Sequence, residues 1–269
     1  MVEVEGVALD VTRRGSGPPV VCLSAVGHDQ RDFEALTDRL GDRFEFIAID
    51  WPGHGGSGMD KEPASAARYA DLLTAALDAL GVPRPILIGN SIGGAAAIIH
   101  ASRRPVRALV LCDSGGLVPV GAVTRAFCGM GEAMFRAGER RAWWYPRAFA
   151  LYYRLVLPAP AAATRRGEIV ADGSRMASVL RQVWASFARP DADLRDMAAA
   201  LDIPIWVAWA KSDRVIPLGL CRRAINRMKR VTVATFVGGH SPFLEQPDAF
   251  AEGFLAFAAG LDGAGEGAD

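Results

Sequence analysis

Short apolar runs alternate along the chain with longer stretches that have the periodicity of helices. Residues 2–12 alternate apolar and polar side chains, which is typical of a half-buried strand. A strand buried on both faces is instead a mostly continuous apolar run, and such runs predict further strands at 20–23, 44–49, 86–88, 107–112, 203–210 and 231–236. Helical patterns occur at 31–40, 64–80, 93–102 and 242–259. This alternation predicts an α/β fold with a mostly parallel central sheet flanked by helices.

The long stretch between the strands predicted at 107–112 and 203–210 interrupts the alternation. Its pattern is mostly helical, and it is rich in aromatic side chains, namely Trp143, Trp144, Tyr145, Tyr152, Tyr153 and Trp184. Because ligands of open α/β folds bind at the carboxyl ends of the strands, we interpret 117–202 as a helical lid inserted over that edge. The core then comprises 1–116 and 203–269. We expect most of these aromatic side chains to fill the lid's own small core, and the tail 260–269 to be frayed.

The charge balance and the hydropathy narrow the function classes. Lys plus Arg and Asp plus Glu both number 30, so the net charge is zero and gives no electrostatic basis for binding nucleic acid or an anionic membrane. The amino-terminal residues lack the pattern of a signal peptide, and no apolar run is long enough to span a bilayer. We therefore expect a cytoplasmic protein with a small-molecule substrate and no membrane partner. The sequence leaves the oligomeric state open, a homodimer included.

The cysteines and the ligand-type residues indicate neither a metal nor an organic cofactor. Cys22, Cys112, Cys128 and Cys221 form no C-x-x-C pair, and two of them lie in predicted buried strands, so we expect free buried thiols in a reducing compartment. We identify no metal-ligand cluster and no phosphate-binding loop. The expected chemistry is therefore that of the side chains alone.

The strongest local signal is the run Gly-Asn-Ser-Ile-Gly-Gly at 89–94. It follows the apolar strand predicted at 86–88 and precedes an Ala-rich helical stretch, which is the strand–turn–helix setting of a G-x-S-x-G nucleophile elbow. In such a tight turn, a side chain at Gly89 or Gly93 would collide with the neighbouring backbone. We predict that Ser91 is the nucleophile and that the N–H of Ile92, at the start of the helix, donates to an oxyanion.

A serine hydroxyl is a weak nucleophile and needs a base. His240 follows the last predicted strand, in a loop that can reach the end of a neighbouring parallel strand, and we predict that it is this base. Asp213 follows the strand predicted at 203–210 and is the favoured partner for the second nitrogen of the imidazole. Asp113, which also follows a strand, is the rival acid, for which we favour a structural or pocket-lining role. His54 lies in a Gly-rich loop and is interpreted as a residue that braces this loop.

Taken together, these motifs resemble those of the α/β-hydrolase superfamily over nearly the whole chain. Residues 50–57 are similar to its D-x-P-G-x-G-x-S loop, 239–242 to its G-H-x-P loop, and 211–217 to its acid loop, with Lys at the first position. One stretch departs from the family: Ser24 and Ala25 stand where His-Gly is expected. The position in that loop makes the N–H of Val26 the predicted second oxyanion donor.

The resemblance implies a serine hydrolase that works by acyl transfer. The leading hypothesis is cleavage of a small or medium carboxylic ester or lactone through an acyl-enzyme on Ser91. Two alternatives stay open: a carbon–carbon bond hydrolase acting on a vinylogous diketone, and a small-molecule binding protein that retains the fold. In the first alternative, Arg165 or Arg166 would hold an acid group, although a solvated charge pair is favoured.

The same hypothesis assigns three residues to the substrate pocket. These predicted substrate-binding residues are Ser24, Phe243 and Trp143. For Ser24, a hydrogen bond within its own turn is the favoured alternative.

Overall fold

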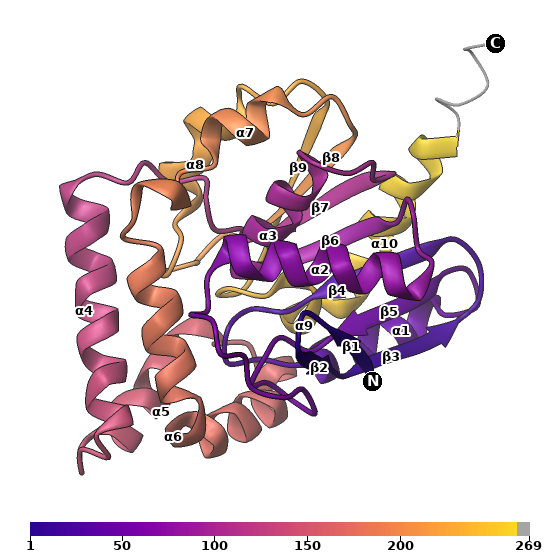
Figure 1. Ribbon diagram of the computed structural model, residues 1–269. Coiled ribbons are helices and arrows are strands. Elements are labelled where there is room, and N and C mark those ends of the chain that lie inside the picture. Colours follow the sequence, from indigo (N-terminus) through magenta and orange to yellow (C-terminus); the bar gives the residue numbers. More distant parts are fainter. Residues whose placement is uncertain (263–269) are drawn as a thin grey trace.

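A seven-stranded sheet forms the centre of the computed structural model, which describes residues 1–262 (Figure 1). The strand order is β3-β5-β4-β6-β7-β8-β9, and every neighbouring pair is parallel except β3 with β5. The strands are β3 (Val11–Gly15), β4 (Pro19–Leu23), β5 (Glu45–Ile49), β6 (Ile86–Asn90), β7 (Ala108–Cys112), β8 (Ile205–Ala210) and β9 (Val231–Phe236). The neighbouring strands β6, β7 and β8 are buried at every position. The prediction of a mostly parallel sheet is confirmed.

The amino-terminal strand predicted at 2–12 is wrong as a single element. The chain instead forms a small antiparallel hairpin from β1 (Val2–Val4) and β2 (Val7–Leu9), and only then enters the central sheet as β3. Glu5 and Gly6 make the turn with φ of 49° and 79°, the backbone that a two-residue hairpin requires. The apolar positions change phase at the turn, from Val2 and Val4 in β1 to Val7 and Leu9 in β2. Interpreting 2–12 as one alternating strand overlooked this shift.

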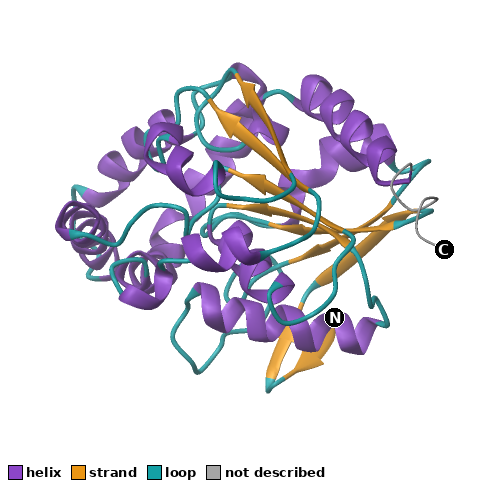
Figure 2. Cartoon of the chain, turned by 90° about the horizontal axis from the view of Figure 1, so that it is seen from above, coloured by secondary structure: helices purple, strands orange, loops and turns teal. Residues whose placement is uncertain are grey.

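Helices cover both faces of the sheet (Figure 2). They are η1 (Gln30–Phe33), α1 (Glu34–Leu40), α2 (Ala66–Leu80), α3 (Ile92–Ala101), α8 (Leu218–Ile225), α9 (Pro242–Glu245) and α10 (Pro247–Asp262). The last predicted helix is split at Gln246, whose φ of −137° is not helical, because a residue before proline is disfavoured in the helical region. Helix α10 extends through residues 260–262; the rest of the tail predicted to fray, 263–269, lies outside the described residues.

The segment between β7 and β8 is helical and packs around its own aromatic side chains. It contains α4 (Ala122–Glu139), α5 (Tyr145–Val156), η2 (Pro160–Ala162), α6 (Ala163–Ser186), η3 (Pro190–Ala192) and α7 (Arg195–Ala200). Helices α4, α5 and α6 lie together beside the sheet (Figure 1). They approach closely at Gly131 and Gly173, where a Cβ atom would lie 2.1 Å from the Trp184 ring and 2.2 Å from the Phe149 ring.

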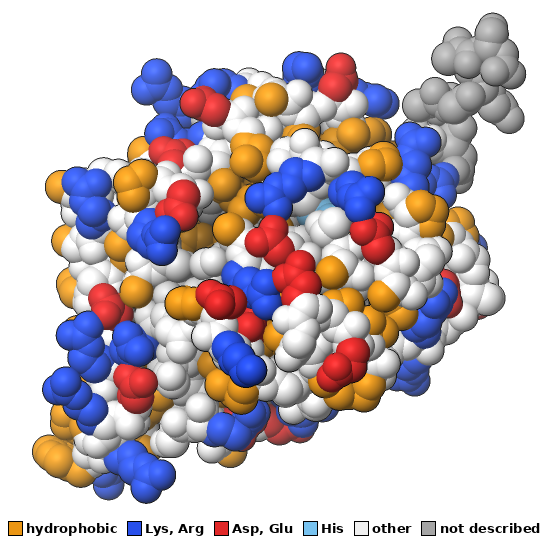
Figure 3. Space-filling model, viewed as in Figure 1, with side chains coloured by type: hydrophobic (Ala, Val, Ile, Leu, Met, Phe, Trp, Pro, Cys, Tyr) orange, Lys and Arg blue, Asp and Glu red, His pale blue; other side chains and the backbone are white. Residues whose placement is uncertain are grey.

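The distribution of surface charges and the state of the cysteines are as expected from the sequence. Basic and acidic side chains are interspersed over the face drawn in Figure 3, as expected for a chain with equal numbers of both. All four cysteines are free and buried, as predicted. Among the helices that the structure describes, none is long and apolar enough to cross a membrane.

Candidate active site

Ser91 occupies the sharp turn between β6 and α3. Its φ of 53° and ψ of −116° are unusual for a residue with a side chain. The flanking glycines are sterically required: a Cβ atom at Gly89 would lie 2.6 Å from the carbonyl oxygen of Gly93, and one at Gly93 would lie 2.4 Å from that of Leu23. The turn therefore has the strained geometry that the motif predicts, and it directs Ser91 into a cavity.

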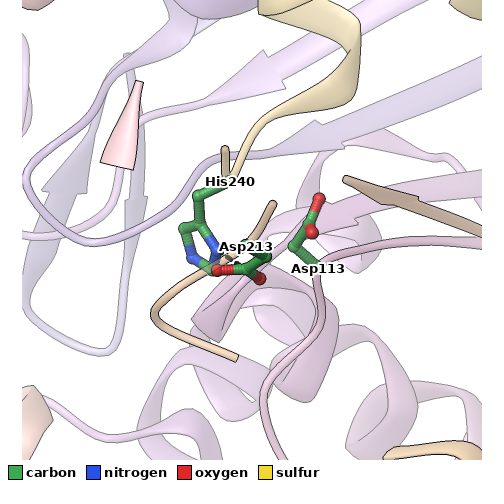
Figure 4. Close-up of side chains that lie close together, drawn as sticks. All are labelled: Asp113, Asp213 and His240. Carbon is green, nitrogen blue, oxygen red and sulfur yellow. Dashed lines mark hydrogen bonds and ion pairs between the residues drawn. The ribbon is translucent and has the colours of Figure 1, made fainter. Parts of the chain in front are cut away.

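His240 and Asp213 are brought together by the loops after β9 and β8. The Nδ1–H of His240 donates to Oδ2 of Asp213 at 2.9 Å, and both side chains are buried (Figure 4). The other oxygen, Oδ1, accepts the N–H groups of Val215 at 2.8 Å and Ile216 at 3.0 Å. Burial opposes ionisation of Asp213, but His240 and these N–H groups outweigh it and hold the pKa of Asp213 below its usual range. The carboxylate is thus fixed and negative.

Ser91 and His240 line the same cavity, which has a volume of about 280 Å³. Within residues 1–262, the hydrogen bond of the His240 ring goes to Asp213, and none joins the imidazole to the Ser91 hydroxyl. Such bonds are often long in enzymes without substrate and shorten when substrate binds. The Ser91 hydroxyl and the His240 imidazole, which is hydrogen-bonded to Asp213, therefore line the same cavity.

The loop after β4 presents Val26 to this cavity and is firmly held. The N–H of Gly27 donates to Nε2 of His54 at 2.8 Å, and Nδ1 of His54 lies 2.9 Å from the carbonyl oxygen of Pro52. Burial lowers the pKa of His54 to about 4, so the neutral imidazole accepts at Nε2 and donates at Nδ1. His54 therefore braces the loop after β4 in addition to its own loop.

The predicted oxyanion donors are placed compatibly with that role. The N–H of Val26 donates to no other described residue, and its residue lines the cavity. Ile92 is the first residue of α3, where the helix cannot satisfy the N–H group. Ile92 thus directly follows Ser91, and Val26 lines the cavity that Ser91 also lines.

The three residues predicted to contact substrate do not line the cavity. The Ser24 side chain is buried, and its Oγ has no hydrogen-bond partner. Phe243 stacks on Phe33 in the core, with ring centroids 4.5 Å apart. Trp143 lies in the connection between α4 and α5 and is 82% exposed. Sequence position alone does not determine these side-chain directions, which depend on packing between elements.

Other aromatic and polar side chains line the cavity instead. Tyr152 and Tyr153 of α5, Trp184 of α6, and His28 face it together with apolar side chains. Sequence reasoning assigned no role to His28, whose Nδ1 lies 2.5 Å from Oδ2 of Asp32. The i,i+4 spacing of His28 and Asp32 in the sequence GHDQRD is the pattern that could have predicted this contact.

Arg165 is neither a solvated cation nor free to bind a substrate. Its side chain is 8% exposed; Nε donates to Asp32 at 2.6 Å, and Nη2 lies 2.9 Å from Asp29. Arg166 donates to the carbonyl oxygen of Leu157. Both arginines are thus engaged within the protein, and Arg165 joins α6 to the loop after β4.

Two further side chains hold the His240 loop and were missed as functional residues. The Asn90 amide donates to the carbonyl oxygens of His240 at 2.8 Å and of Cys112 at 3.0 Å. Oε2 of Glu245 accepts the N–H groups of Gly239 at 2.7 Å and of His240 at 3.1 Å. The elbow Asn and the Glu five residues after His240 are the sequence signals for this support.

Asp113, the rival acid, makes no hydrogen bond to His240. It follows β7 with a φ of 44°, is fully buried, and accepts the N–H of Ala210 at 3.0 Å. One ligand-type atom from each of Asp113, Asp213 and His240 lies within 4.8 Å of the others, the kind of spacing that can hold a metal ion. Because both oxygens of Asp213 already accept N–H groups, including that of His240, this group is a hydrogen-bonded cluster.

Comparison with known proteins supports the family. Residues 20–253 match the sequence model described as "Alpha/beta hydrolase family". A pimeloyl-[acyl-carrier protein] methyl ester esterase of Xanthomonas campestris is 30% identical over 264 residues, which cover 92% of this chain and 97% of that protein.

Two solved structures have the same fold. An esterase from Rhodococcus sp. is 22% identical with a TM-score of 0.79, over 97% of this chain and 98% of that one. An N-acyl homoserine lactone degrading enzyme is 25% identical with a TM-score of 0.73, over 95% and 99%. This chain therefore belongs to the alpha/beta hydrolase family and is a hydrolase.

Proposed function

We propose that the protein is a serine hydrolase that cleaves a small or medium carboxylic ester or lactone through an acyl-enzyme on Ser91. The observation that supports this most strongly is the geometry of one cavity. Ser91 stands on a strained elbow in the same cavity as His240, and the second nitrogen of His240 is bonded to the buried carboxylate of Asp213.

The proposed reaction proceeds in two steps. His240 takes the Ser91 proton at Nε2 while Oγ attacks the carbonyl carbon, and the N–H groups of Ile92 and Val26 bind the developing oxyanion. The imidazolium then protonates the leaving alkoxide, which leaves an acyl-enzyme. Water, deprotonated by His240, attacks the acyl carbon and releases the acid and Ser91. Asp213 holds the imidazole tautomer and balances the imidazolium charge.

The cavity favours a substrate of modest size with apolar groups. Its volume of about 280 Å³ is near the lower end for small-molecule sites. The helical segment between β7 and β8 supplies much of its aromatic lining, which supports the division into a core and a lid over 117–202. The printed activities of two relatives, a methyl ester esterase and a lactone-degrading enzyme, are of the proposed class.

The contacts of the arginines weaken the carbon–carbon hydrolase alternative. That alternative uses Arg165 or Arg166 to hold a substrate acid group, but Arg165 is buried among Asp29, Asp32 and Glu168. Removing Arg165 from these acids would deprive the buried carboxylates of Asp29 and Asp32 of a buried counter-charge. An ester or lactone requires no such cation.

A substrate panel tests this proposal. The panel contains short-chain and medium-chain esters, lactones and a vinylogous diketone, and it is assayed with the wild type, Ser91→Ala and Ser16→Ala. Ser16 is exposed and outside the cavity, so its variant controls for a serine-to-alanine change. We expect ester or lactone turnover by the wild type and Ser16→Ala, and loss of at least about 10⁴-fold in Ser91→Ala. Full residual turnover in Ser91→Ala would overturn the role of Ser91, and cleavage of the diketone alone would overturn the substrate class.

A further inference from the structure

Asp113 is a buried carboxyl group for which the proposed mechanism has no use. It is fully buried at the end of β7, in a left-handed backbone conformation with a φ of 44°. Strain of this kind in a non-glycine residue persists only where the surroundings enforce it. It lies beside the His240–Asp213 pair (Figure 4), with one ligand-type atom of each of the three residues within 4.8 Å of the others.

The two oxygens of Asp113 have different surroundings. Oδ1 accepts the N–H of Ala210 at 3.0 Å, as a carbonyl-type oxygen does. Oδ2 is buried and meets no hydrogen-bond donor, an arrangement that is costly for an ionised carboxylate. A proton on Oδ2 converts this atom into a donor, and the carboxylate of Asp213 is within the 4.8 Å cluster. The contacts therefore fit a carboxylic acid better than a carboxylate.

The charges around the carboxyl groups of Asp113 and Asp213 lead to the same assignment. The described groups that face these two carboxyl groups are His240, Glu245, Tyr152 and the thiols of Cys112 and Cys221. Burial raises the pKa of both thiols and of Tyr152, so these three groups are neutral. The ring Nδ1–H of His240 donates to Asp213, which also accepts two backbone N–H groups. Two buried like charges at this separation do not both ionise readily.

We propose that Asp113 is a neutral carboxylic acid that donates its proton to the Asp213 carboxylate, and that it acts as a positioning residue for the His240–Asp213 pair. Burial, and then the charge of Asp213, raise the pKa of Asp113 well above its usual range, in agreement with this assignment. The proton stays on Asp113 throughout the cycle.

This arrangement has a consequence for the base. With Asp113 neutral, Asp213 is the one ionised member of the two aspartates, and its charge balances one imidazolium when His240 accepts the Ser91 proton. If Asp113 were ionised, two negative charges would favour a protonated imidazole in the resting enzyme, and a protonated imidazole cannot act as the base. The hydrogen bond also restrains the Asp213 carboxylate, in addition to His240 and the two backbone N–H groups.

Infrared spectroscopy tests the protonation state without any turnover. Spectra of the wild type are recorded with ordinary and isotope-labelled aspartate at about pH 8, where unperturbed aspartates are ionised. Burial raises the pKa of Asp50 to about 6, so that group is ionised as well. We expect one carboxylic-acid C=O band that shifts with the label and is lost in Asp113→Asn. A wild-type spectrum without such a band overturns the proposal.

The pH profile provides a second test, which rests on the proposed function. The acid limb of kcat/KM reports the essential base of the free enzyme. Asp113→Asn keeps a neutral donor, so we expect its acid limb to stay within about 0.3 pH unit of the wild type. If Asp113 is ionised in the wild type, the substitution removes a charge about 5 Å away, and the limb moves down by at least about one pH unit. That shift would contradict the proposal.

The variant Asp113→Leu separates the hydrogen bond from packing. Leucine fills the space but gives Asp213 no donor, so we expect kcat to fall by about tenfold or more, with KM nearly unchanged. Asp113→Asn should recover most of this loss. Equal losses in the two variants would assign Asp113 a packing role only. A wild type that shows the infrared band but turns over no ester would contradict the proposed function and leave the protonation of Asp113 supported.

Discussion

Two His–Asp pairs lie at the same cavity, and their surroundings differ. His240 and Asp213 come from loops that follow two neighbouring strands, and Asp213 also accepts two backbone N–H groups of its own loop. His28 lies in the loop after β4 and Asp32 four residues later in η1, and Asp32 is paired with Arg165 from α6. A histidine beside an aspartate is thus compatible with two tasks, and the other partners of the aspartate distinguish them.

This comparison assigns a chemical role to the His240–Asp213 pair and a structural role to the His28–Asp32 pair. The His240 pair is anchored to the sheet and shares its cavity wall with the elbow of Ser91. The His28 pair ties the loop that carries Val26 to the helix α6 through a buried network of charges. Its imidazole also lines the cavity, so it is in a position to contact bound substrate. The predictions below separate these two tasks.

The largest expected effect is a difference in kcat between the variants of the two histidines. His240→Ala should lower kcat by about 10⁴-fold, because the base is removed. His28→Ala should act mainly through KM and lower kcat by less than about tenfold. Steady-state kinetics on one ester, with circular dichroism as a folding control, measure both. Similar losses of kcat in the two variants would show that the comparison is wrong.

The second prediction concerns the structural role of the His28–Asp32 pair, which links the loop after β4 to α6 through Arg165. Arg165→Met should lower the free energy of unfolding by about 3 kcal/mol, because Asp29 and Asp32 lose a buried counter-charge. Arg136, which pairs with Glu132 on the exposed face of α4, provides the matched control. Arg136→Met should change stability by less than about 1 kcal/mol. Denaturant unfolding measures both values, and an equally small change in Arg165→Met would mean that the network does not hold α6.

The third prediction uses the brace under the Val26 loop. Burial lowers the pKa of His54 to about 4, against about 6.5 in an unfolded chain. The unfolded state therefore binds more protons in this interval, so stability is fully present above about pH 6.5 and declines as the pH falls towards 4. The contribution of His54 is at most about 3 kcal/mol.

A variant isolates this contribution. Burial also lowers the pKa of His100 to about 4, so the wild type carries two such contributions. Asp50 acts in the opposite direction, because its raised pKa of about 6 makes the folded state bind more protons in this range. Compared with the wild type, the stability of His54→Gln should therefore decline by up to about 3 kcal/mol less between about pH 6.5 and 4. Unfolding experiments across this range provide the measurement. An unchanged slope would show that His54 is not a buried neutral brace.

The smallest expected effect is on chain-length preference. Trp184 lines the cavity from α6, so Trp184→Ala should raise kcat/KM for a longer acyl chain relative to a shorter one by about tenfold. Trp143→Ala is the control, because Trp143 is 82% exposed and outside the cavity. A shift of preference in Trp143→Ala, and not in Trp184→Ala, would contradict the cavity as the substrate site.

The residues at strand ends could be predicted from the sequence because their positions follow from the fold. In a parallel sheet, loops after successive strands meet at one edge, so the G-x-S-x-G turn, Asp213 and His240 each follow an apolar run at that edge. The brace by His54 was also predicted, since a Gly-rich loop offers few other fixed points. These inferences need only local patterns and the direction of the strands.

The pocket lining could not be predicted, because it depends on packing between distant elements. Trp143 and Trp184 are equally apolar in the sequence, yet a turn exposes one while contact with α4 and α5 buries the other. Two of the counter-charges of Arg165, those of Asp29 and Asp32, likewise lie more than 130 residues away. The single strand expected at 2–12 and the single helix expected at 242–259 failed for local reasons, a hairpin turn at Gly6 and a break before Pro247.

Labelling with a fluorophosphonate probe, followed by intact mass and peptide mapping, tests the central claim most directly. The wild type, Ser91→Ala, His240→Ala and His28→Ala are compared under one set of conditions. The account predicts one adduct on Ser91 in the wild type and in His28→Ala, and no adduct in Ser91→Ala or His240→Ala over the same time. An adduct that forms at the wild-type rate in His240→Ala, or a folded wild type that does not react, would contradict an activated serine at this site.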